Sequence, residues 1–330
     1  MERKDVTEAT REKVKNIERL ITVDIGGRGI ITPIYRESFT VQEELPTLLA
    51  AKKIKNRVDQ RDYLFITTGF PVPPLFIQET DGPIGAISLA RGIEKISEVN
   101  PIIVAEEEAL PIIKATALAG GLNAVHPDEV KKANHAVALL GFPKEKKQAL
   151  KKAEEVIERF SPSLLLAVEK VGANEAGVYH NMGGHDISRY AAKIEPLLRQ
   201  AEDNGVPTIG IGDGGNEIGM GKIKKLIKEE VPYGDTCRCE CGKGIAADFA
   251  TDILVPATVS NWGAHAIIAT LSLLVEKDLL HSPEIEAEML MDAAKAGSVD
   301  GTSGYPNGWC DGISTSTHAS LMRILKEILK

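Results

Sequence analysis

Residues 207–229 read PTIGIGDGGNEIGMGKIKKLIKE, and this stretch indicates the fold more clearly than any other. The apolar run at 207–211 predicts a buried strand, and the periodic run at 222–229 predicts a helix. The glycine-rich turn between them carries Asp213, Asn216 and Glu217. Open α/β sheets bind their ligands at such strand ends, and glycines let the backbone turn tightly and approach a ligand closely. We therefore expect a site for a hard cation or a polar substrate here.

The same alternation of strand and helix recurs along the chain. Short apolar runs predict strands at residues 64–67, 102–105, 163–168, 207–211 and 252–255. Helical periodicity predicts a surface helix within residues 1–20 and further helices at 85–99, 127–140, 144–159, 187–204, 222–229, 262–277 and 317–329. This order is typical of an α/β protein whose largely parallel or mixed sheet is flanked by helices, and we expect an acidic cleft at the strand C-terminal ends.

Composition indicates a chain that folds by burial alone. Hydrophobic residues make up 43% of the 330 residues, which is enough to form a large core without stabilising cross-links. No repeat or linker divides the sequence, so we predict a single compact domain over residues 1–330. The segment 296–317, rich in Gly, Ser, Thr and Asp, suits either a lid or an ordered loop.

Charge and apolar pattern exclude several classes of partner. A net charge of −8 argues against nucleic acid, because duplex binding needs a clustered excess of Lys and Arg. No apolar run approaches the roughly 20 residues that cross a bilayer, so we expect no membrane contact. Four cysteines do not make a disulfide framework in a chain of this size, and a reducing compartment, by default the cytoplasm, fits them.

Three of the cysteines, Cys237, Cys239 and Cys241, occupy alternate positions, which on a strand would place all three thiols on one face. Such an arrangement could hold a soft metal. However, structural zinc usually uses paired C-x-x-C motifs, and only Cys310 and seven scattered histidines remain to complete a set. Exposed or core thiols are therefore the favoured interpretation.

Further acids follow other predicted strands. Glu169 ends the strand at 163–168, while Glu79 and Asp81 follow the strand at 64–67 and a proline-rich segment. Asp186 precedes a predicted helix and suits either an N-cap or a metal ligand. Carboxylates at several strand ends repel one another, so a bound cation or the protonation of one acid must reduce this repulsion. The predicted metal ligands are Asp213, Glu217, Asp186, Glu169, Glu79 and Asp81, of which the first four are also the predicted catalytic acids.

Oxygen ligands with little His or Cys favour Mg²⁺, Mn²⁺ or Ca²⁺. Arg28 is the best candidate to hold a substrate carboxylate or phosphate bidentately. The other predicted substrate-binding residues are Thr68, Asn181, His185, Asn216 and Asn261. Residues 210–215 formally match G-x-G-x-x-G, but Asp213 and Glu217 would lie beside the pyrophosphate, so no nicotinamide or flavin is expected.

Five motifs taken together resemble the C-terminal domain of the D-glutamate cyclase family. They are TGFPVPP at 68–74, ETDGP at 79–83, YHNM at 179–182 with HDI at 185–187, GDGGNEIGMG at 212–221, and VSNWG at 259–263. The resemblance implies conversion of D-glutamate to 5-oxo-D-proline and water, with Glu217 or Asp186 taking a proton from the amine and Arg28 holding the α-carboxylate. The longer relatives carry an additional N-terminal domain that we do not find in this sequence.

Two other functions fit the acids. Asp213, Glu217, Asp186 and Glu169 could bind two cations that clamp a phosphoryl group, as in a metal-dependent phosphatase. Alternatively, the protein could bind a metal or an acidic metabolite without turnover. Each alternative implies a small acidic ligand, D-glutamate or a phosphate ester in the enzymatic cases, and none indicates the oligomeric state.

Overall fold

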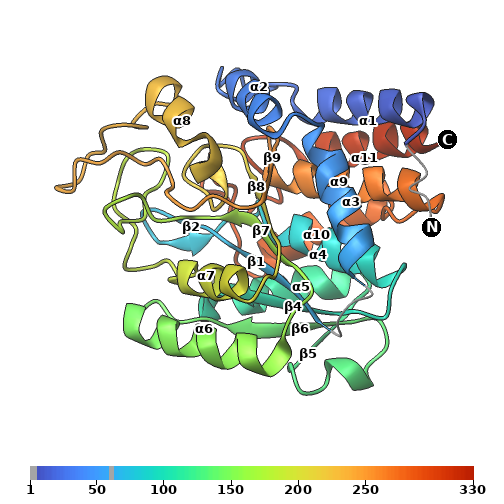
Figure 1. Ribbon diagram of the computed structural model, residues 1–330, viewed down its shortest axis with the longest axis horizontal. Coiled ribbons are helices and arrows are strands. Elements are labelled where there is room, and N and C mark those ends of the chain that lie inside the picture. Colours follow the sequence, from blue (N-terminus) through green and yellow to red (C-terminus); the bar gives the residue numbers. More distant parts are fainter. Residues whose placement is uncertain (1–5, 59–62) are drawn as a thin grey trace.

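The computed structural model describes residues 6–58 and 63–330 and shows an α/β fold built on a seven-stranded parallel sheet (Figure 1). The strand order is β5-β6-β4-β1-β7-β8-β9. These strands are β1 (Tyr63–Gly69), β4 (Asn100–Ala105), β5 (Asn123–Val125), β6 (Ala136–Gly141), β7 (Leu165–Lys170), β8 (Thr208–Gly212) and β9 (Ile253–Pro256). A separate antiparallel hairpin is formed by β2 (Pro71–Val72) and β3 (Ile77–Gln78). The predicted fold class is thus confirmed.

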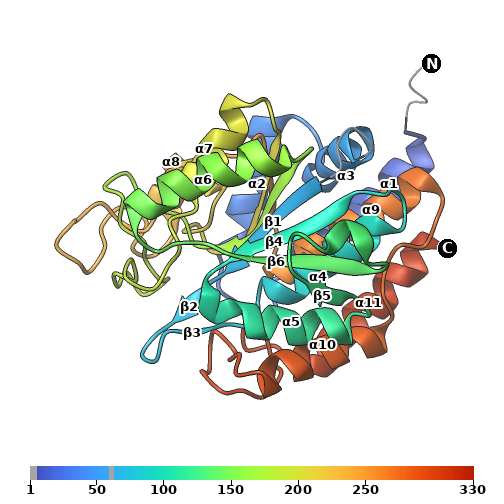
Figure 2. The same cartoon turned by 90° about the horizontal axis from the view of Figure 1, so that it is seen from below.

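Helices cover both faces of the sheet (Figure 2). They are α1 (Glu8–Ile21), α2 (Ile31–Gln42), α3 (Pro46–Arg57), α4 (Pro83–Glu94), α5 (Leu110–Ala119), α6 (Lys146–Phe160), α7 (Glu195–Asp203), α8 (Lys224–Glu230), α9 (Ser260–Val275), α10 (Pro283–Lys295) and α11 (Thr315–Leu329). Short 3₁₀ turns occur at η1 (Glu107–Ala109), η2 (Val130–Lys132) and η3 (Met220–Ile223). None of the helices in the described part of the chain is both long and apolar enough to span a membrane.

Alternating side chains of the strands build two core layers. Leu64 and Ile66 of β1 pack into the core beneath α4 and α9, whereas Phe65 packs into the core beneath α6 and α7. Because both faces are buried, β1, β4, β7, β8 and β9 are continuous apolar runs, which is why the sequence predicts them; β5 and β6 are less buried and were not predicted as strands. Helix α1 contributes Val14, Ile17 and Ile21 to the interior from one side only, as its amphipathic pattern indicates.

Two predicted helices are wrong in part. The segment 127–140 contains η2 and most of strand β6, because the apolar run beginning at Ala136 is a buried strand whose short length periodicity cannot distinguish from a helix. The segment 187–204 is helical only over α7. Residues 187–194 form turns and irregular backbone, and the ammonium group of Lys193 lies against the face of the Tyr179 ring. Helices α2, α3, α5 and α10 were not predicted at all.

The order of the strands determines where a ligand can bind. From β1 the chain builds β4, β5 and β6 on one side, then returns to add β7, β8 and β9 on the other side of β1. The crossover connections therefore diverge between β1 and β7. Parallel sheets bind ligands in the crevice at such a switch point, beyond the carboxyl ends of the strands.

Candidate functional site

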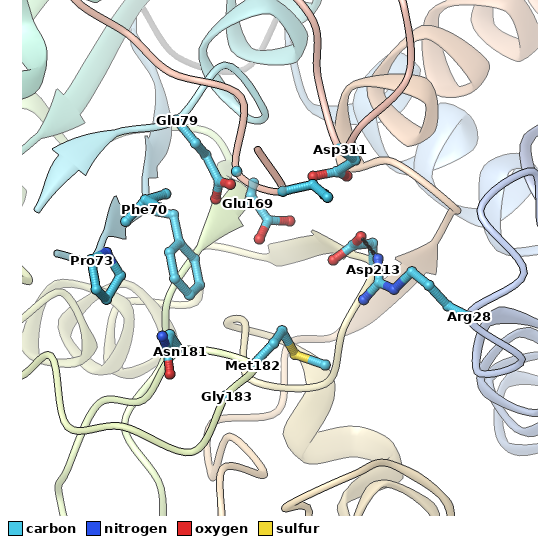
Figure 3. Close-up of a pocket in the computed structure, with 13 residues that line it drawn as sticks. Arg28, Phe70, Pro73, Glu79, Glu169, Asn181, Met182, Gly183, Asp213 and Asp311 are labelled. Atoms are coloured by element: carbon cyan, nitrogen blue, oxygen red, sulfur yellow. Dashed lines mark hydrogen bonds and ion pairs between the residues drawn. The ribbon is translucent and has the colours of Figure 1, made fainter. Parts of the chain in front are cut away.

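A cavity of about 330 Å³ lies beyond the C-terminal ends of β1, β7 and β8 (Figure 3). Figure 3 shows the carboxylates of Glu79, Glu169, Asp213 and Asp311 turned toward this space, with the side chain of Arg28 beside Asp213. Its lining consists of Arg28, Phe70, Val72, Pro73, Glu79, Glu169, Asn181, Met182, Gly183, Asp213, Gly301, Thr302 and Asp311. Four carboxylates and one guanidinium thus share one pocket.

Glu169 enters the pocket through an irregularity in the sheet. Thr68 pairs with Val168 and Gly69 pairs with Lys170, so Glu169 is the unpaired residue of a bulge. Its φ of 42° lies in the left-handed region, which re-aims the side chain at the end of β7. The hydroxyl of Ser260 donates a hydrogen bond of 2.5 Å to Glu169 Oε2. Burial, followed by repulsion from Glu217 and Asp213, raises the pKa of Glu169 well above its ordinary value.

A buried ion pair holds this end of β7 in place. Lys170, the next residue, forms an ion pair with Glu106, and both side chains are completely inaccessible to solvent. Lys170 Nζ also donates to the carbonyl of Gly69 at 3.3 Å, so one ammonium group joins the ends of β1 and β7. The backbone N–H of Ala192 donates to Glu106 Oε1 at 2.8 Å. The pair positions the bulge and does not face the pocket lining.

Asp213 follows β8 and forms an ion pair with Arg28, which comes from the loop between α1 and α2. The Arg28 side chain is 34% exposed, whereas that of Asp213 is 8% exposed. One guanidinium nitrogen is engaged by Asp213, and a guanidinium has five N–H donors, so Arg28 keeps donors for a second anion. The loop of Arg28 is itself held by Asp24, whose carboxylate accepts the Arg28 N–H at 2.9 Å.

Glu217 organises the glycine-rich turn from within. Its Oε1 accepts the N–H of Gly214 at 2.7 Å, and its Oε2 accepts that of Gly215 at 2.7 Å. Burial and the adjacent Asp213 carboxylate raise the pKa of Glu217 to about 8, although these amide hydrogen bonds act to lower it. Glu217 is completely buried and lies behind Asp213, outside the pocket lining. It shapes the turn that presents Asp213.

Asp81 and Asn261 cap helices near the pocket. Asp81 accepts the N–H groups of Ser260 at 2.7 Å and Asn261 at 2.8 Å, at the start of α9. Asn261 Oδ1 accepts the N–H groups of Gly82 at 3.0 Å and Gly85 at 2.6 Å, at the start of α4. Burial, followed by Asp213, raises the pKa of Asp81 to about 7. Capping therefore accounts for the contacts of both residues, and neither lines the pocket.

Glu79 and Asp311 supply the remaining pocket acids. Burial and neighbouring Asp81 raise the pKa of Glu79 well above its ordinary value, and burial and Asp213 do the same for Asp311. Among the described residues, Asp311 Oδ2 is buried without a hydrogen-bond partner. A buried, unpaired carboxylate oxygen is costly, so this position favours a cation or a proton.

The other predicted site residues divide between the pocket and its surroundings. Asn181 lines the pocket, whereas Asn216 lies beneath it and donates a 2.8 Å hydrogen bond to the carbonyl of His180. Thr68 is completely buried at the end of β1. His185 and Asp186 are exposed and outside the pocket lining, and Asp186 Oδ1 accepts the N–H of Ser188 at 2.8 Å in a local turn. The structure thus does not bring Asp186 to the other acids.

Two groups of side chains offer ligand atoms within 4.8 Å of one another near the pocket. Glu169, Asp213 and Glu217 form an all-oxygen group, which suits a hard cation such as Mg²⁺, Mn²⁺ or Ca²⁺. The second group combines Asp81 and Asp311 with the thiol of Cys310. The unpaired Asp311 oxygen and the raised pKa values of Glu169 and Asp311 agree with a need for positive charge in the pocket.

Sequence reasoning missed Asp311, Phe70, Met182 and Thr302 as pocket residues. Asp311 belongs to a segment with no preceding strand, so its position relative to a sheet could not be inferred. The clue was compositional: residues 296–317 combine glycines, aspartates and aromatic residues in the manner of functional loops. In the structure, Gly301, Thr302 and Asp311 of this segment form one wall of the pocket.

The fold and site define an α/β protein with a pocket rich in carboxylates at the switch point of a parallel sheet. Residues 17–326 match the family described as D-glutamate cyclase-like, C-terminal, and the chain belongs to this family. It is similar to the mitochondrial D-glutamate cyclase of Homo sapiens, with 30% identity over 271 residues, or 80% of this chain. The chain spans only 39% of the length of that human protein.

Proposed function

We propose that the chain is a divalent-metal-dependent lyase that converts D-glutamate to 5-oxo-D-proline and water in this pocket. Family membership supports the reaction class, and the human relative is named for this activity. The observation that carries the proposal is the convergence of Glu79, Glu169, Asp213 and Asp311 on one cavity that also presents Arg28. A glutamate substrate brings two further carboxylates and one ammonium group, so its binding among four pocket carboxyls is favoured by positive charge beyond that of one guanidinium.

The reaction forms a C–N bond between the α-amine and the γ-carboxyl carbon and breaks a C–O bond. The ammonium nitrogen loses two protons in total, and the departing oxygen gains two protons to leave as water. A bound cation would supply positive charge that polarises the γ-carboxyl group. Glu169, Asp213 and Glu217 would hold this cation, because their oxygens approach one another within 4.8 Å.

Proton transfer falls to the acids whose pKa values are raised and which face the cavity. Glu169 has one oxygen bonded to Ser260 and would use the other for the cation, whereas Glu79 lies on the adjacent wall and belongs to neither ligand group. Repulsion between such buried carboxyls favours one ionised and one protonated group, the pairing that a base and an acid require. Arg28 would bind the substrate α-carboxylate with the donors that Asp213 leaves free. Asp186 does not line the pocket, so we assign it no role in the reaction.

A second candidate function is a metal-dependent phosphatase. The specific observation in its favour is the presence of two adjacent ligand groups, Glu169–Asp213–Glu217 and Asp81–Cys310–Asp311, because two-metal phosphatases clamp a phosphoryl group between neighbouring ions. The thiol of Cys310 suits a hard cation poorly, which places this candidate second.

The test is turnover by chelator-treated protein after one cation at a time is restored. We expect Mn²⁺ or Mg²⁺ to restore formation of 5-oxoproline from D-glutamate. Glu169→Gln and Asp311→Asn should each lower kcat/KM by about 100-fold or more, the usual effect of removing a group that transfers protons or stabilises charge. Asp278→Asn is the matched control, since Asp278 is exposed, lies outside the pocket lining, and forms an ion pair with Lys326 and accepts the N–H of Leu280.

Several outcomes would count against the lyase. Phosphate release from an ester panel, with no loss of D-glutamate, would make the protein a phosphatase. Cation and D-glutamate binding without turnover would make it a binding protein. Equal activity of Asp311→Asn and Asp278→Asn would show that the pocket assigned here is not the reacting site.

The cytoplasmic location inferred from the sequence stays a prediction, and the human relative is named as mitochondrial.

A further inference from the structure

A second cluster of metal-ligating side chains lies outside the carboxylate pocket, in the segment that follows α8. This segment, residues 231–252, contains no helix or strand, so the alternate spacing of Cys237, Cys239 and Cys241 does not act through a strand. The loop nevertheless brings the three thiols together. Their Sγ atoms lie 3.4 Å apart for Cys237–Cys239, 3.4 Å for Cys237–Cys241 and 3.3 Å for Cys239–Cys241.

A buried histidine completes the cluster from another part of the chain. His180 Nε2 lies 3.2 Å from Cys239 Sγ and 3.7 Å from Cys241 Sγ. The His180 side chain has no exposed surface, and its Nδ1 atom has no hydrogen-bond partner among the described residues. Sequence reasoning counted the histidines without finding this one, because 57 residues separate it from Cys237. A buried imidazole aimed at three thiols needs an explanation beyond packing.

The geometry fits a single tetrahedral ion better than any covalent or packing alternative. A disulfide brings two sulfurs to about 2.05 Å, far closer than any pair here. Zn–S bonds of about 2.3 Å at tetrahedral angles place sulfurs about 3.8 Å apart, close to the observed spacing. All four ligand atoms lie within 4.8 Å of one another, close enough to bind one ion. An iron–sulfur cluster would instead spread its ligands over more than one iron.

We propose that Cys237, Cys239, Cys241 and His180 bind one Zn²⁺ ion in a closed, structural site. Three thiolates and one imidazole are a ligand set that zinc uses in such sites, and no ligand position remains for a substrate. Asn174 supports the set, because its Nδ2 lies 3.4 Å from Cys241 Sγ and donates at 2.7 Å to the carbonyl of Gly244. Hydrogen-bond donors to ligand atoms are a regular feature of metal sites.

The ion would fasten one wall of the carboxylate pocket. Asn181, Met182 and Gly183, which line the pocket, directly follow His180 in the chain. The backbone of the same wall is held by a 2.9 Å hydrogen bond from the N–H of Arg238 to the carbonyl of Gly184. Zinc would therefore tie the cysteine loop to the segment 180–184 without taking part in the chemistry of the pocket. This inference does not depend on which reaction the pocket performs.

The first test is the metal content of the whole chain, purified under reducing conditions from zinc-supplemented cells. We expect close to one zinc per chain that survives dialysis and is released by a mercurial thiol reagent. Replacement by Co²⁺ should give the intense visible absorption of tetrahedral cobalt with thiolate ligands. These readouts require neither an active enzyme nor a variant that folds.

Variants then assign the ligands. Cys239→Ser and His180→Ala should lose zinc at least tenfold relative to the parent chain, whereas Glu240→Gln, an exposed position within the same loop, should keep it. Several results would overturn the proposal: less than a tenth of an ion per chain, full zinc content in Cys239→Ser, a mass two hydrogens lower that shows a disulfide, or the brown colour of an iron–sulfur cluster.

Discussion

Replacing Lys170 with methionine should destabilise the protein by about 3–5 kcal/mol, because it leaves the carboxylate of Glu106 buried without its partner. Both side chains are 0% exposed, so neither water nor salt can take over the role of the ammonium group. One oxygen of Glu106 would still accept the N–H of Ala192, but Oε2 already has no partner within the described residues. Methionine fills much the same volume as lysine, which confines the change to charge and hydrogen bonding.

The expected loss can be expressed as a shift in melting temperature. Unfolding entropy is about 2.1 cal/mol/K per residue, which for 330 residues gives about 0.7 kcal/mol/K. A loss of 3–5 kcal/mol therefore lowers the melting temperature by about 4–7 °C. Urea denaturation followed by circular dichroism measures the free energy of unfolding directly.

The double variant Lys170→Met with Glu106→Gln provides the control. Glutamine removes the buried charge and keeps an oxygen for the N–H of Ala192, so we expect it to recover more than half of the loss. A cost below about 1 kcal/mol for Lys170→Met, or no recovery in the double variant, would refute the interpretation of this pair as the anchor of β7.

Two further predictions concern other parts of the structure. Burial lowers the pKa of His281 to about 4. Between about pH 6.5 and pH 4 the unfolded histidine therefore binds a proton that the folded one does not, so the free energy of unfolding should fall as the pH falls through this range. The loss should reach roughly 3 kcal/mol and should shrink in His281→Asn; an equal pH dependence in both proteins would exclude His281 as its source. Separately, Gly301→Ala should lower turnover with little change in melting temperature, because the added methyl group would collide with Glu79 Oε2. An unchanged kcat/KM would show that the position of Glu79 is not critical.

The sequence predicts strands well where burial on both faces of the sheet produces a continuous run of apolar residues. The predicted strands at 64–67, 102–105, 163–168 and 252–255 agree with β1, β4, β7 and β9 to within a few residues, because strands buried on both faces are continuous apolar runs. The same pattern fails at β6, where only the first three of the six residues are buried and the apolar run was assigned to a helix over 127–140.

Of the acids that the sequence predicts as site residues, Asp213, Glu169 and Glu79 line the pocket; Asp213 follows β8 and Glu169 lies at the end of β7, and parallel strands end at one edge of a sheet. The sequence could not separate acids that face the pocket from those that hold it together. Glu217 and Asp81 follow the same rule, yet their oxygens are directed to backbone N–H groups. That distinction depends on where amide groups point, which only the folded backbone determines.

Contacts between distant segments were decided entirely by the tertiary structure. Asp311 reaches Asp213 across the pocket, and His180 reaches three cysteines from a different loop. Local propensity and periodicity describe neighbours within a few residues, whereas these side chains meet only because the sheet and its covering helices bring their loops to one edge. The sequence by itself therefore determined the fold class and the strand-end acids, while packing decided which side chains share a site.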